Sequence, residues 1–464
     1  MNKSEIVQIV KDQRDFFNTG RTRDINFRKE HLAKLKHAFE KYETEIIDAV
    51  KSDMGRANVE TYFMELHMNM EEVNFALKHI DNWTEARKVK TPTLFFMAES
   101  RLYPEPLGVA LIISAWNFPI LQLFSPLIGA IAAGNTAILK PASDSVACSR
   151  VAKKITEEIF ASEYVICIEG KSDITTMLLE ERFDHLFFTG SPKVGKVIQE
   201  AASKYLTPCT LELGGKSPAI VDEGCDVDQA AKRIVWCKLF NTGQVCVTVD
   251  HVYLHKNIKQ EFLEACKKYI VQFFGEDAST SEDYGFIIND RNFDRLLTYL
   301  NNGTLIYGGR TNKAKRYIEP TILDNIQEDD AIMQEEIFGP ILPVLEFENI
   351  DQWIKSQQLK EKPLSLYFFS KSEENIKKVI LGTSSGGVTI NDCMGHGGTN
   401  YLPFGGVGNS GMGSYHGKAT FDLFTHYKAV LEAPTAHLLD LPIKYGPYKG
   451  KYEMIKKMEK FHLI

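Results

Sequence analysis

The sequence lacks the cysteine patterns of a metal site or a disulfide framework. Its eight cysteines are scattered, and no two of them stand at Cys-x-x-Cys spacing. This excludes the usual zinc and redox motifs, and we expect no bound metal. Scattered free cysteines are typical of a reducing compartment, so the sequence predicts a cytoplasmic protein. The stretch MNKSEIVQIVKDQRDFF at the N-terminus has no apolar core or cleavage site, and we expect no signal peptide.

An excess of positive charge is also absent. The formal net charge is -7, with 44% apolar and 25% charged residues, which is ordinary for a soluble globular protein and gives no indication of nucleic-acid binding. At 464 residues the chain exceeds the size of a single hydrophobic core, so we expect two or three domains. No internal repeat or low-complexity linker marks their boundaries.

Charge of either sign is missing from residues 106–139, PLGVALIISAWNFPILQLFSPLIGAIAAGNTAIL. A run of this length could cross a bilayer. However, Pro119 suits the first turn of a helix, and Gly134 with Asn135 suits a helix end. The interpretation we favour is therefore a strand, a helix and a second strand, because strands that are buried on both faces carry no charge. This interpretation predicts no transmembrane segment.

Short apolar runs alternate with helical stretches along most of the chain. VALIISA, TAILK, YVICIEG and HLFFTG recur between residues 108 and 190, and a second series from SPAIVD to GGVTIND follows. Alternation of this kind predicts an α/β fold with a doubly wound parallel sheet, which binds ligands at the carboxyl ends of its strands.

The stretch FFTGSPKVGKVI, residues 187–198, comes close to a phosphate-binding P-loop. Val197 stands where a P-loop needs Ser or Thr to hold Mg²⁺, and the Gly-x-Gly-x-x-Gly fingerprint is absent. The residues from Val194 onward show helical spacing, so the turn lies between a strand and a helix N-terminus, which favours an anion. By itself this turn fits a phosphate site or a plain structural turn equally well.

Five further motifs occur in the same chain: AWNFP (115–119), TLELGGKSP (210–218), FNTGQVC (240–246), EEIFGP (335–340) and LPFGGVGNSGMG (402–413). With these motifs, in this order, the sequence resembles the aldehyde dehydrogenase superfamily, and PFGGVGNSGMGSYHGK is most similar to its class 3 branch. The resemblance runs from about residue 10 to about residue 450. It implies that FFTGSPKVGKVI is a dinucleotide phosphate turn.

The strand count places a domain boundary near Leu213, Gly214 and Gly215, and the resemblance implies what each part does. A Rossmann-like nucleotide-binding domain would cover residues 1–210, with 98–107 contributing to a small β oligomerisation arm. A second α/β catalytic domain would cover 211–412, and a C-terminal arm with a basic tail would cover 413–464. Class 3 enzymes are homodimers, and we expect ESRLYPEP and the residues after about 420 to form the contact.

Three residues are candidates for the catalytic chemistry. Oxidation of an aldehyde needs a soft nucleophile, donors for an oxyanion and a base that activates water. By resemblance Cys246 is the nucleophile that carries the thioester intermediate, Asn117 is the oxyanion donor and Glu212 is the base. Leu211 and Leu213 flank Glu212, which predicts partial burial and a raised pKa. The sequence does not indicate what activates Cys246.

The cofactor expected from the resemblance is NAD or NADP. Lys140 would reach the adenosine ribose, the turn with Ser191 would hold the pyrophosphate, and Glu336 and Phe338 would position the nicotinamide end. Many family members carry Glu where this chain has Ser143, and loss of that carboxylate removes repulsion of a 2′-phosphate, so we expect NADP to be used as well as NAD. The candidate cofactor residues are Lys140, Ser143, Gly190, Ser191, Gly195, Trp116, Glu336 and Phe338.

The substrate is less defined by the sequence. Tyr62, Trp236, Met394 and His396 are candidates for an apolar tunnel, and class resemblance suggests medium- or long-chain aliphatic or aromatic aldehydes. Two other functions stay open: acyl transfer to coenzyme A, which the presence of Glu212 disfavours, and a non-catalytic nucleotide-binding protein.

The tail KYGPYKGKYEMIKKMEKFHLI carries six lysines against two glutamates, which fits a solvated tail or weak peripheral contact with anionic membrane lipid.

Overall fold

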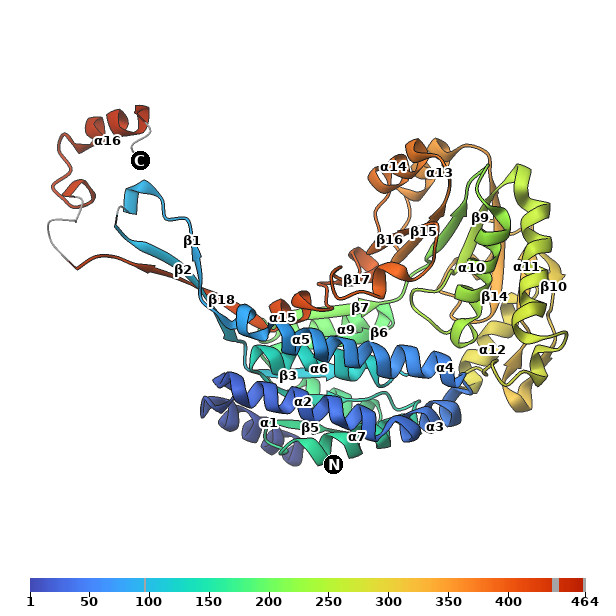
Figure 1. The fold of residues 1–464 in the computed structure, drawn as a ribbon, viewed down its shortest axis with the longest axis horizontal. Coiled ribbons are helices and arrows are strands. Elements are labelled where there is room, and N and C mark those ends of the chain that lie inside the picture. Colours follow the sequence, from blue (N-terminus) through green and yellow to red (C-terminus); the bar gives the residue numbers. More distant parts are fainter. Residues whose placement is uncertain (96, 436–441, 462–464) are drawn as a thin grey trace.

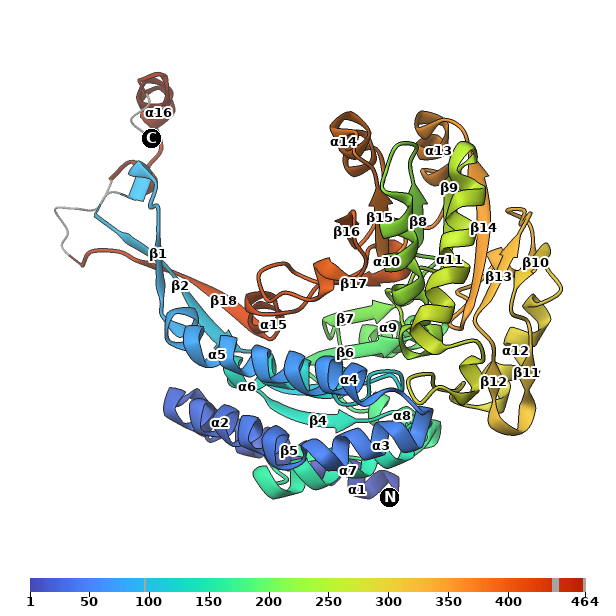
Figure 2. The same ribbon diagram turned by 45° about the vertical axis from the view of Figure 1, so that its right-hand side comes forward.

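The computed structural model describes residues 1–95, 97–435 and 442–461. The chain forms two lobes, each built around its own sheet, and a three-stranded arm that extends from the first lobe (Figure 1). A view turned by 45° shows the same separation of the arm from the second lobe (Figure 2).

The first lobe contains a six-stranded sheet. Its strands in chain order are β3 (Val109–Ile113), β4 (Thr136–Lys140), β5 (Val165–Cys167), β6 (His185–Gly190), β7 (Cys209–Leu213) and β17 (Gly411–Met412). In the sheet the order is β17-β7-β6-β3-β4-β5, and only β17 is antiparallel to its neighbour. The chain order therefore reverses between β3 and β6, which is the switch point where such sheets bind ligands.

Helices cover both faces of this sheet, as a doubly wound fold requires. One face is covered by α1 (Lys3–Asn18), α8 (Ser172–Leu179) and α9 (Pro192–Ser203), and the other by α2 (Ile25–Lys41), α3 (Glu43–Met54), α5 (Met68–Thr84), α6 (Leu121–Ala133) and α7 (Val146–Ile159). Successive residues of β3 divide between the two cores, since Leu111 packs in one and Ile112 in the other. The predicted doubly wound sheet is confirmed.

The uncharged run 106–139 forms β3, α6 and β4, as predicted. Every residue of α6 is buried, because the helix packs on the sheet and is covered by α2, α5 and α15 (Lys418–Leu423). Gly134 ends the helix with a φ of 94°. Within the described residues, no helix is both long and apolar enough to cross a membrane.

The second lobe contains a seven-stranded sheet with the order β10-β13-β14-β9-β8-β15-β16. The strands are β8 (Pro218–Val221), β9 (His251–His255), β10 (Thr304–Tyr307), β13 (Thr321–Asp324), β14 (Ile341–Phe347), β15 (Ser365–Phe369) and β16 (Gly387–Ile390). All pairs are parallel except β10 with β13. The helices of this lobe are α10 (Val227–Leu239), α11 (Lys259–Phe274), α12 (Asp290–Tyr299), α13 (Ile350–Gln357) and α14 (Glu373–Gly382).

The chain passes from the first sheet to the second after β7 and returns at β17. The boundary expected between residues 210 and 211 falls inside β7, whose Leu211 and Leu213 side chains pack in the core of the first lobe. Gly411 and Met412 likewise pair with β7 rather than with the second sheet. The crossings thus lie at about 214 and 410, at the ends of two paired strands.

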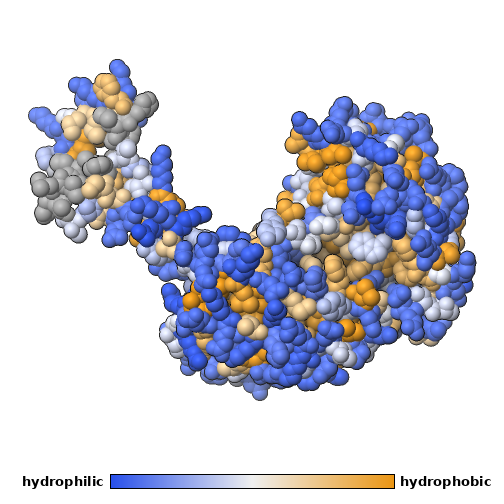
Figure 3. Space-filling model, in the orientation of Figure 1, coloured by the Kyte–Doolittle hydropathy of each residue, from blue (hydrophilic) through white to orange (hydrophobic). Residues whose placement is uncertain are grey.

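The arm consists of β1 (Arg87–Val89), β2 (Glu99–Pro106) and β18 (Thr425–Glu432), all antiparallel. Residues 99–106 and 425–432 therefore lie side by side in this arm. The helix α16 (Lys451–Lys460) follows the arm, and none of its described residues is buried. A wide gap separates this end of the chain from the second lobe, and the surface around it is mainly hydrophilic (Figure 3).

Candidate active site

A cavity of about 790 Å³ lies between the two lobes, outside the carboxyl ends of β3, β6 and β7. Its size is within the range of small-molecule sites. Eight of the eleven predicted catalytic and cofactor residues line it: Trp116, Asn117, Gly190, Ser191, Glu212, Cys246, Glu336 and Phe338. The sheet order explains this convergence, because the loops after β3 and β6 leave the sheet at its switch point.

The loop that carries Cys246 follows α10 through a left-handed turn. Asn241, Thr242 and Gly243 have φ values of 48°, 56° and 75°. Such values are unfavourable for a β-branched residue like Thr242, and backbone strain of this kind collects at functional sites. Gly243 is required here, since a Cβ on it would lie 2.3 Å from the carbonyl oxygen of Gly339.

The side chain of Gln244 fixes this loop to the second lobe. Its Nε2 donates to the carbonyl oxygens of Asn241 and Phe286, both at 3.1 Å, and its Oε1 accepts from the backbone N–H of Ile288 at 3.0 Å. Both N–H donors of the Gln244 amide and its oxygen are thus bonded to the backbone. These bonds hold the chain two residues before Cys246.

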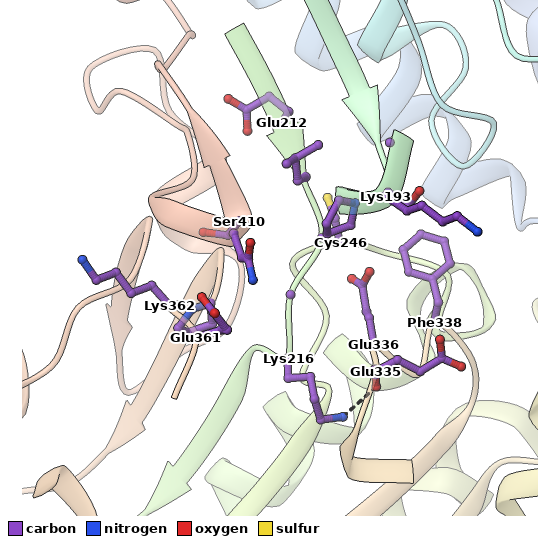
Figure 4. Close-up of a pocket in the computed structure, with 18 of the residues that line it drawn as sticks. Lys193, Glu212, Lys216, Cys246, Glu335, Glu336, Phe338, Glu361, Lys362 and Ser410 are labelled. Atoms are coloured by element: carbon purple, nitrogen blue, oxygen red, sulfur yellow. Dashed lines mark hydrogen bonds between the residues drawn. The ribbon is translucent and has the colours of Figure 1, made fainter. Parts of the chain in front are cut away.

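Cys246 is half-buried, and among the described residues it is the one cysteine in the lining of the cavity. Burial above all, with the carboxylates of Glu336 and Glu212, raises the pKa of its thiol to about 12, while the N–H groups of Cys246 and Val247 favour the thiolate. In the view of Figure 4, Cys246 lies between Glu212 and Glu336. Cys237 is fully buried in the core, as its position in a helix predicts.

Glu212 is buried on β7, and neither carboxyl oxygen has a hydrogen-bond partner among the described residues. Burial alone raises the pKa of this carboxyl well above its ordinary value. Sequence reasoning predicted partial burial, and the structure shows nearly complete burial without an ion pair. A desolvated carboxyl in a cavity is the arrangement expected for a general base.

The amide of Asn117 is held in one orientation by two glutamines. Its Nδ2 donates to the carbonyl oxygen of Gln244 at 3.2 Å, and its Oδ1 accepts from Nε2 of Gln122 at 3.1 Å. The N–H₂ group therefore faces the loop of Cys246. Sequence reasoning missed Gln122, although a glutamine in the otherwise apolar helix α6 was the available signal.

Glu336 and Phe338 project from a loop that Lys216 and Asp250 fix. Lys216 Nζ donates to the carbonyl oxygen of Glu335 at 2.9 Å (Figure 4). It also donates to Asp250 Oδ2 at 2.6 Å, and Asp250 Oδ1 accepts from the backbone N–H of Ile337 at 2.8 Å. Sequence reasoning missed both residues. The Lys in the motif TLELGGKSP was a signal for the first, whereas nothing in the sequence singles out Asp250.

The carboxyl group of Glu336 lies against the backbone of Gly214. A Cβ on Gly214 would meet Glu336 Oε2 at 2.0 Å, so any larger residue there would displace the carboxyl group. Burial raises the pKa of Glu336 to about 8, and its Oε1 has no hydrogen-bond partner in the part of the chain that the structure describes. The ring of Phe338 meets Trp116 edge to face, with centroids 5.4 Å apart.

The turn between β6 and α9 forms as predicted. Ser191 is the N-cap of α9, and its Oγ accepts from the N–H of Val194 at 3.4 Å. Lys193 lines the cavity beside this turn. Gly195 does not, because it packs beneath Leu213, where a Cβ would be 2.7 Å from the side chain. Backbone N–H groups, a helix N-terminus and a lysine together suit an anion.

Besides Gly195, six predicted site residues lie outside the lining of the cavity. Lys140 is buried, and its Nζ donates to the carbonyl oxygens of Pro141 and Gly170 at 2.8 and 2.7 Å. His396 is also buried, with its ring bonded to Ser365 Oγ at 3.1 Å and to Thr389 Oγ1 at 2.8 Å. The remaining four are Ser143, Tyr62 and Trp236, which are exposed, and Met394, which packs against the cores.

Both ring nitrogens of His396 are thus hydrogen-bonded within the second lobe, and the residue does not line an apolar tunnel. Within the described part of the chain, no cluster of three or more His, Cys, Asp or Glu side chains has the arrangement of a metal site.

Comparison with known proteins identifies the family. Residues 1–430 match the model of the aldehyde dehydrogenase family. The chain is 44% identical over 453 residues to 4,4′-diaponeurosporen-aldehyde dehydrogenase of Staphylococcus aureus, which covers 97% of this chain and 98% of that protein. It is 41% identical over 448 residues to a dimeric, NADP-preferring aldehyde dehydrogenase of Canis lupus familiaris, with 97% and 99% covered.

A solved structure agrees with the sequence relatives. The substrate-bound state of Staphylococcus aureus AldH superimposes with a TM-score of 0.95 at 44% identity, covering 99% of this chain and 100% of that one. A match over the whole length, in sequence and in fold, leaves one conclusion: this chain belongs to the aldehyde dehydrogenase family.

Proposed function

We propose that this protein oxidises an aldehyde to the carboxylic acid with NAD or NADP, using Cys246 as the nucleophile and Glu212 as the base. The observation that carries the proposal is the meeting of Cys246, a desolvated Glu212 and an oriented Asn117 amide in one cavity. These groups supply the three functions that aldehyde oxidation through a covalent intermediate requires.

The first step would form a bond between Cys246 Sγ and the aldehyde carbon. The thiol proton passes to water, and the N–H groups of Cys246 and Val247 stabilise the thiolate. The carbonyl oxygen becomes an oxyanion, which the Asn117 amide and the backbone N–H of Cys246 would stabilise.

The second step would break the C–H bond of this adduct and leave a thioester on Cys246. A nicotinamide cofactor, when bound, supplies the acceptor for the departing hydride. Glu212 then takes a proton from water as the water attacks the thioester carbon. The C–S bond breaks, the acid leaves, and Cys246 recovers its proton.

The residues of the cavity fit a dinucleotide. Ser191 and Lys193 at the N-terminus of α9 suit a pyrophosphate. Glu336 Oε1 has no hydrogen-bond partner in the described part of the chain, so it could accept a hydrogen bond from a ribose hydroxyl. Trp116 and Phe338 form an aromatic wall for a planar ring. Lys140 could contribute only after its ammonium group is released from two carbonyls.

Class resemblance and two relatives support the finer assignments. The aldehyde would be a medium- or long-chain aliphatic or aromatic one; the Staphylococcus relative is named for 4,4′-diaponeurosporen-aldehyde. The dog relative is dimeric and NADP-preferring, which supports a homodimer formed through the arm and use of NADP. Ser143 is exposed and carries no charge, in keeping with that use.

The proposal is tested by following reduced cofactor with a medium-chain or aromatic aldehyde and with NAD or NADP in separate reactions. We expect turnover that Cys246→Ala abolishes. Glu212→Gln should give a burst of reduced cofactor near one equivalent, followed by slow turnover, because it blocks only hydrolysis. Absence of turnover across several aldehydes with both cofactors, or full turnover in Cys246→Ala, would overturn the proposal.

A further inference from the structure

One short segment of the first lobe holds three charged side chains that the chemistry above does not use. The segment follows α3 and comprises Arg56, the short helix α4 (Asn58–Thr61) and the π-helix Tyr62–His67, which leads into α5. Arg56 and Glu65 form an ion pair in which both side chains are 0% exposed. Neither residue lines the cavity. A π-helical turn is rare and is found mainly at functional sites.

Glu65 caps the helix that begins just after the Asn117 motif. Its Oε2 accepts from the backbone N–H of Ile120 at 3.0 Å and of Leu121 at 2.7 Å, in the first turn of α6. Ile120 itself cannot cap the helix with its side chain. A carboxylate is stabilising at a helix N-terminus, because it satisfies free N–H groups and complements the helix dipole. Glu65 therefore fixes where α6 begins.

Arg56 holds the other end of the same stretch. Its Nη1 donates to the carbonyl oxygen of Asn117 at 3.0 Å, and its guanidinium lies 4.9 Å from the ring centroid of Phe118. Its Nη2 donates to Glu65 Oε1. The pair thus binds the backbone of residues 117–121 at both ends, and this stretch carries the amide that faces Cys246.

The segment also reaches the nucleophile loop. Glu60 Oε2 accepts from the backbone N–H of Asn241 at 3.0 Å, at the first left-handed residue of the turn. Asn241 Nδ2 in turn donates to the carbonyl oxygen of Asn117 at 3.4 Å, which is the same oxygen that Arg56 binds. One segment of about ten residues thus contacts both loops whose relative position sets the distance from Asn117 to Cys246.

Stability is a poor explanation for this arrangement. A buried ion pair is on balance no more stabilising than apolar residues of similar volume, because both charges lose their hydration. Apart from one bond from Arg56 Nε to Thr61 Oγ1 at 3.4 Å, the side chains of Arg56 and Glu65 bond to each other or to the backbone of residues 117–121. Hydrogen bonds of this kind hold a backbone in one place, which apolar packing does less well.

We infer that Arg56 and Glu65, together with Glu60, are positioning residues for the oxidation: they hold the Asn117 amide and the Cys246 loop in the geometry that stabilises the oxyanion. The inference rests on the function proposed above. Its test therefore begins with a wild-type enzyme whose turnover depends on Cys246; if that turnover is absent, the proposed function has failed before the positioning role is examined.

The test compares Arg56→Lys with Arg28→Lys. Arg28 is likewise buried, and its Nη1 donates to the carbonyl oxygen of Ala132 at 3.0 Å, at the opposite end of α6. Lysine at 56 keeps the charge opposite Glu65 but cannot also reach the Asn117 carbonyl. We expect kcat to fall by about ten- to a hundredfold in Arg56→Lys, the size of effect that a displaced catalytic group produces, with KM for aldehyde and cofactor nearly unchanged.

Arg28→Lys should lower the temperature of unfolding without a comparable change in kcat. An equal loss of kcat in both variants, or a loss of thermal stability in Arg56→Lys without a loss of kcat, would show a structural role only and would overturn the inference. The comparison separates a displaced amide from a weakened fold, because both variants alter a buried arginine that donates to a backbone carbonyl oxygen at 3.0 Å, just before α6 for Arg56 and near its end for Arg28.

A second pair of variants examines the nucleophile loop if Arg56→Lys does not fold. Glu60→Ala removes the acceptor for the Asn241 N–H, whereas Glu60→Gln retains a carbonyl oxygen that can accept it. We expect Glu60→Ala to lower kcat and the rate at which iodoacetamide alkylates Cys246, and Glu60→Gln to restore both. Equal rates in the alanine variant and the wild type would contradict the inference for this loop.

Discussion

Gln122 donates from Nε2 to Oδ1 of Asn117 across 3.1 Å, and its own Oε1 accepts from the backbone N–H of Ala115 at 3.2 Å. The amide of Gln122 thus connects the two sides of the loop between β3 and α6. Because Asn117 Oδ1 is committed to Gln122, the Asn117 N–H₂ group must face the loop of Cys246. The orientation of the proposed oxyanion donor is therefore set by a residue in the first turn of the next helix.

Gln122→Met keeps the volume of the side chain and removes this restraint. Asn117 can then rotate, and its buried oxygen loses a partner at a cost of about 1–3 kcal/mol. We expect kcat to fall by about tenfold or more, since a misdirected oxyanion donor acts like a missing one. Stopped-flow measurement of reduced cofactor would locate the loss in the step before the thioester.

The rate at which Cys246 is alkylated in the same variant provides the control. The side chain of Gln122 bonds to Ala115 and Asn117 and not to Cys246 among the described residues, so alkylation by iodoacetamide should proceed at the wild-type rate. If Gln122→Met retains wild-type kcat, the amide of Asn117 does not depend on Gln122 for its orientation.

Gly214→Ala is expected to displace Glu336. The new methyl group would lie 2.0 Å from Glu336 Oε2, which is too close for any contact, so the carboxyl group has to move away. The dissociation constant for NAD or NADP should rise by about tenfold, as expected when one hydrogen bond to a charged group is lost. Isothermal titration of the cofactor without aldehyde would measure this.

Gly398→Ala is a suitable control for that substitution. Gly398 has an ordinary φ of -94°, and a Cβ there would come no closer than 3.7 Å to another atom among its nearest neighbours. Its cofactor affinity should equal that of the wild type. Equal affinities in Gly214→Ala and Gly398→Ala would exclude Glu336 from the cofactor site.

Glu336→Gln should make Cys246 more reactive at alkaline pH. Burial is the main cause of the raised pKa of Cys246, and the negative charge of Glu336 adds to it. Burial also raises the pKa of Glu336 to about 8, so this carboxyl is charged above that pH and disfavours the thiolate there. Its removal lowers the pKa of Cys246, and alkylation at a fixed pH above 8 should become faster by about three- to tenfold.

Glu335→Gln distinguishes this effect from a general loss of negative charge. Glu335 also lines the cavity, but its carboxyl group bonds to Tyr299 and Arg295 and does not contribute to the pKa of Cys246. The pH profile of alkylation should be that of the wild type. A shift of the profile in Glu335→Gln equal to that in Glu336→Gln would remove the specific role of Glu336.

The sequence predicted the strands and helices well because local patterns determine them. An uncharged run broken by Pro119 and Gly134 predicts β3, α6 and β4, since strands buried on both faces admit no charge. The burial of Glu212 was predictable for the same reason, from Leu211 and Leu213 beside it. The catalytic residues themselves came from motifs of the family and not from these patterns.

The partners that orient the site could not be predicted, because they come from distant parts of the chain. Lys140 binds a carbonyl thirty positions away, at Gly170, and Glu65 binds the N–H of Leu121, at a separation of 56. Polar side chains choose partners by tertiary geometry, which no local pattern records. His396 is an example: it was a candidate for an apolar tunnel, but hydrogen bonds to Ser365 and Thr389 hold its buried ring elsewhere.

The choice between NAD and NADP depends on position 143 if the dinucleotide binds as the family resemblance implies. Ser143 is exposed and offers no charge to a 2′-phosphate, so the wild type should use both cofactors. Ser143→Glu restores a carboxylate, which repels the phosphate and accepts hydrogen bonds from ribose hydroxyls instead. We expect kcat/KM for NADP to fall by about tenfold or more, a loss of about 1.4 kcal/mol, while kcat/KM for NAD is kept or increased.

Ser143→Gln separates charge from size, since it has the shape of glutamate without its charge. If repulsion decides the preference, the glutamine variant should retain most of the activity with NADP, and the difference between the two variants should shrink as ionic strength rises, because salt screens exposed charges. An equal loss of NADP activity in both variants would assign the effect to crowding at position 143. Unchanged NADP activity in Ser143→Glu would place the 2′-phosphate elsewhere in the site.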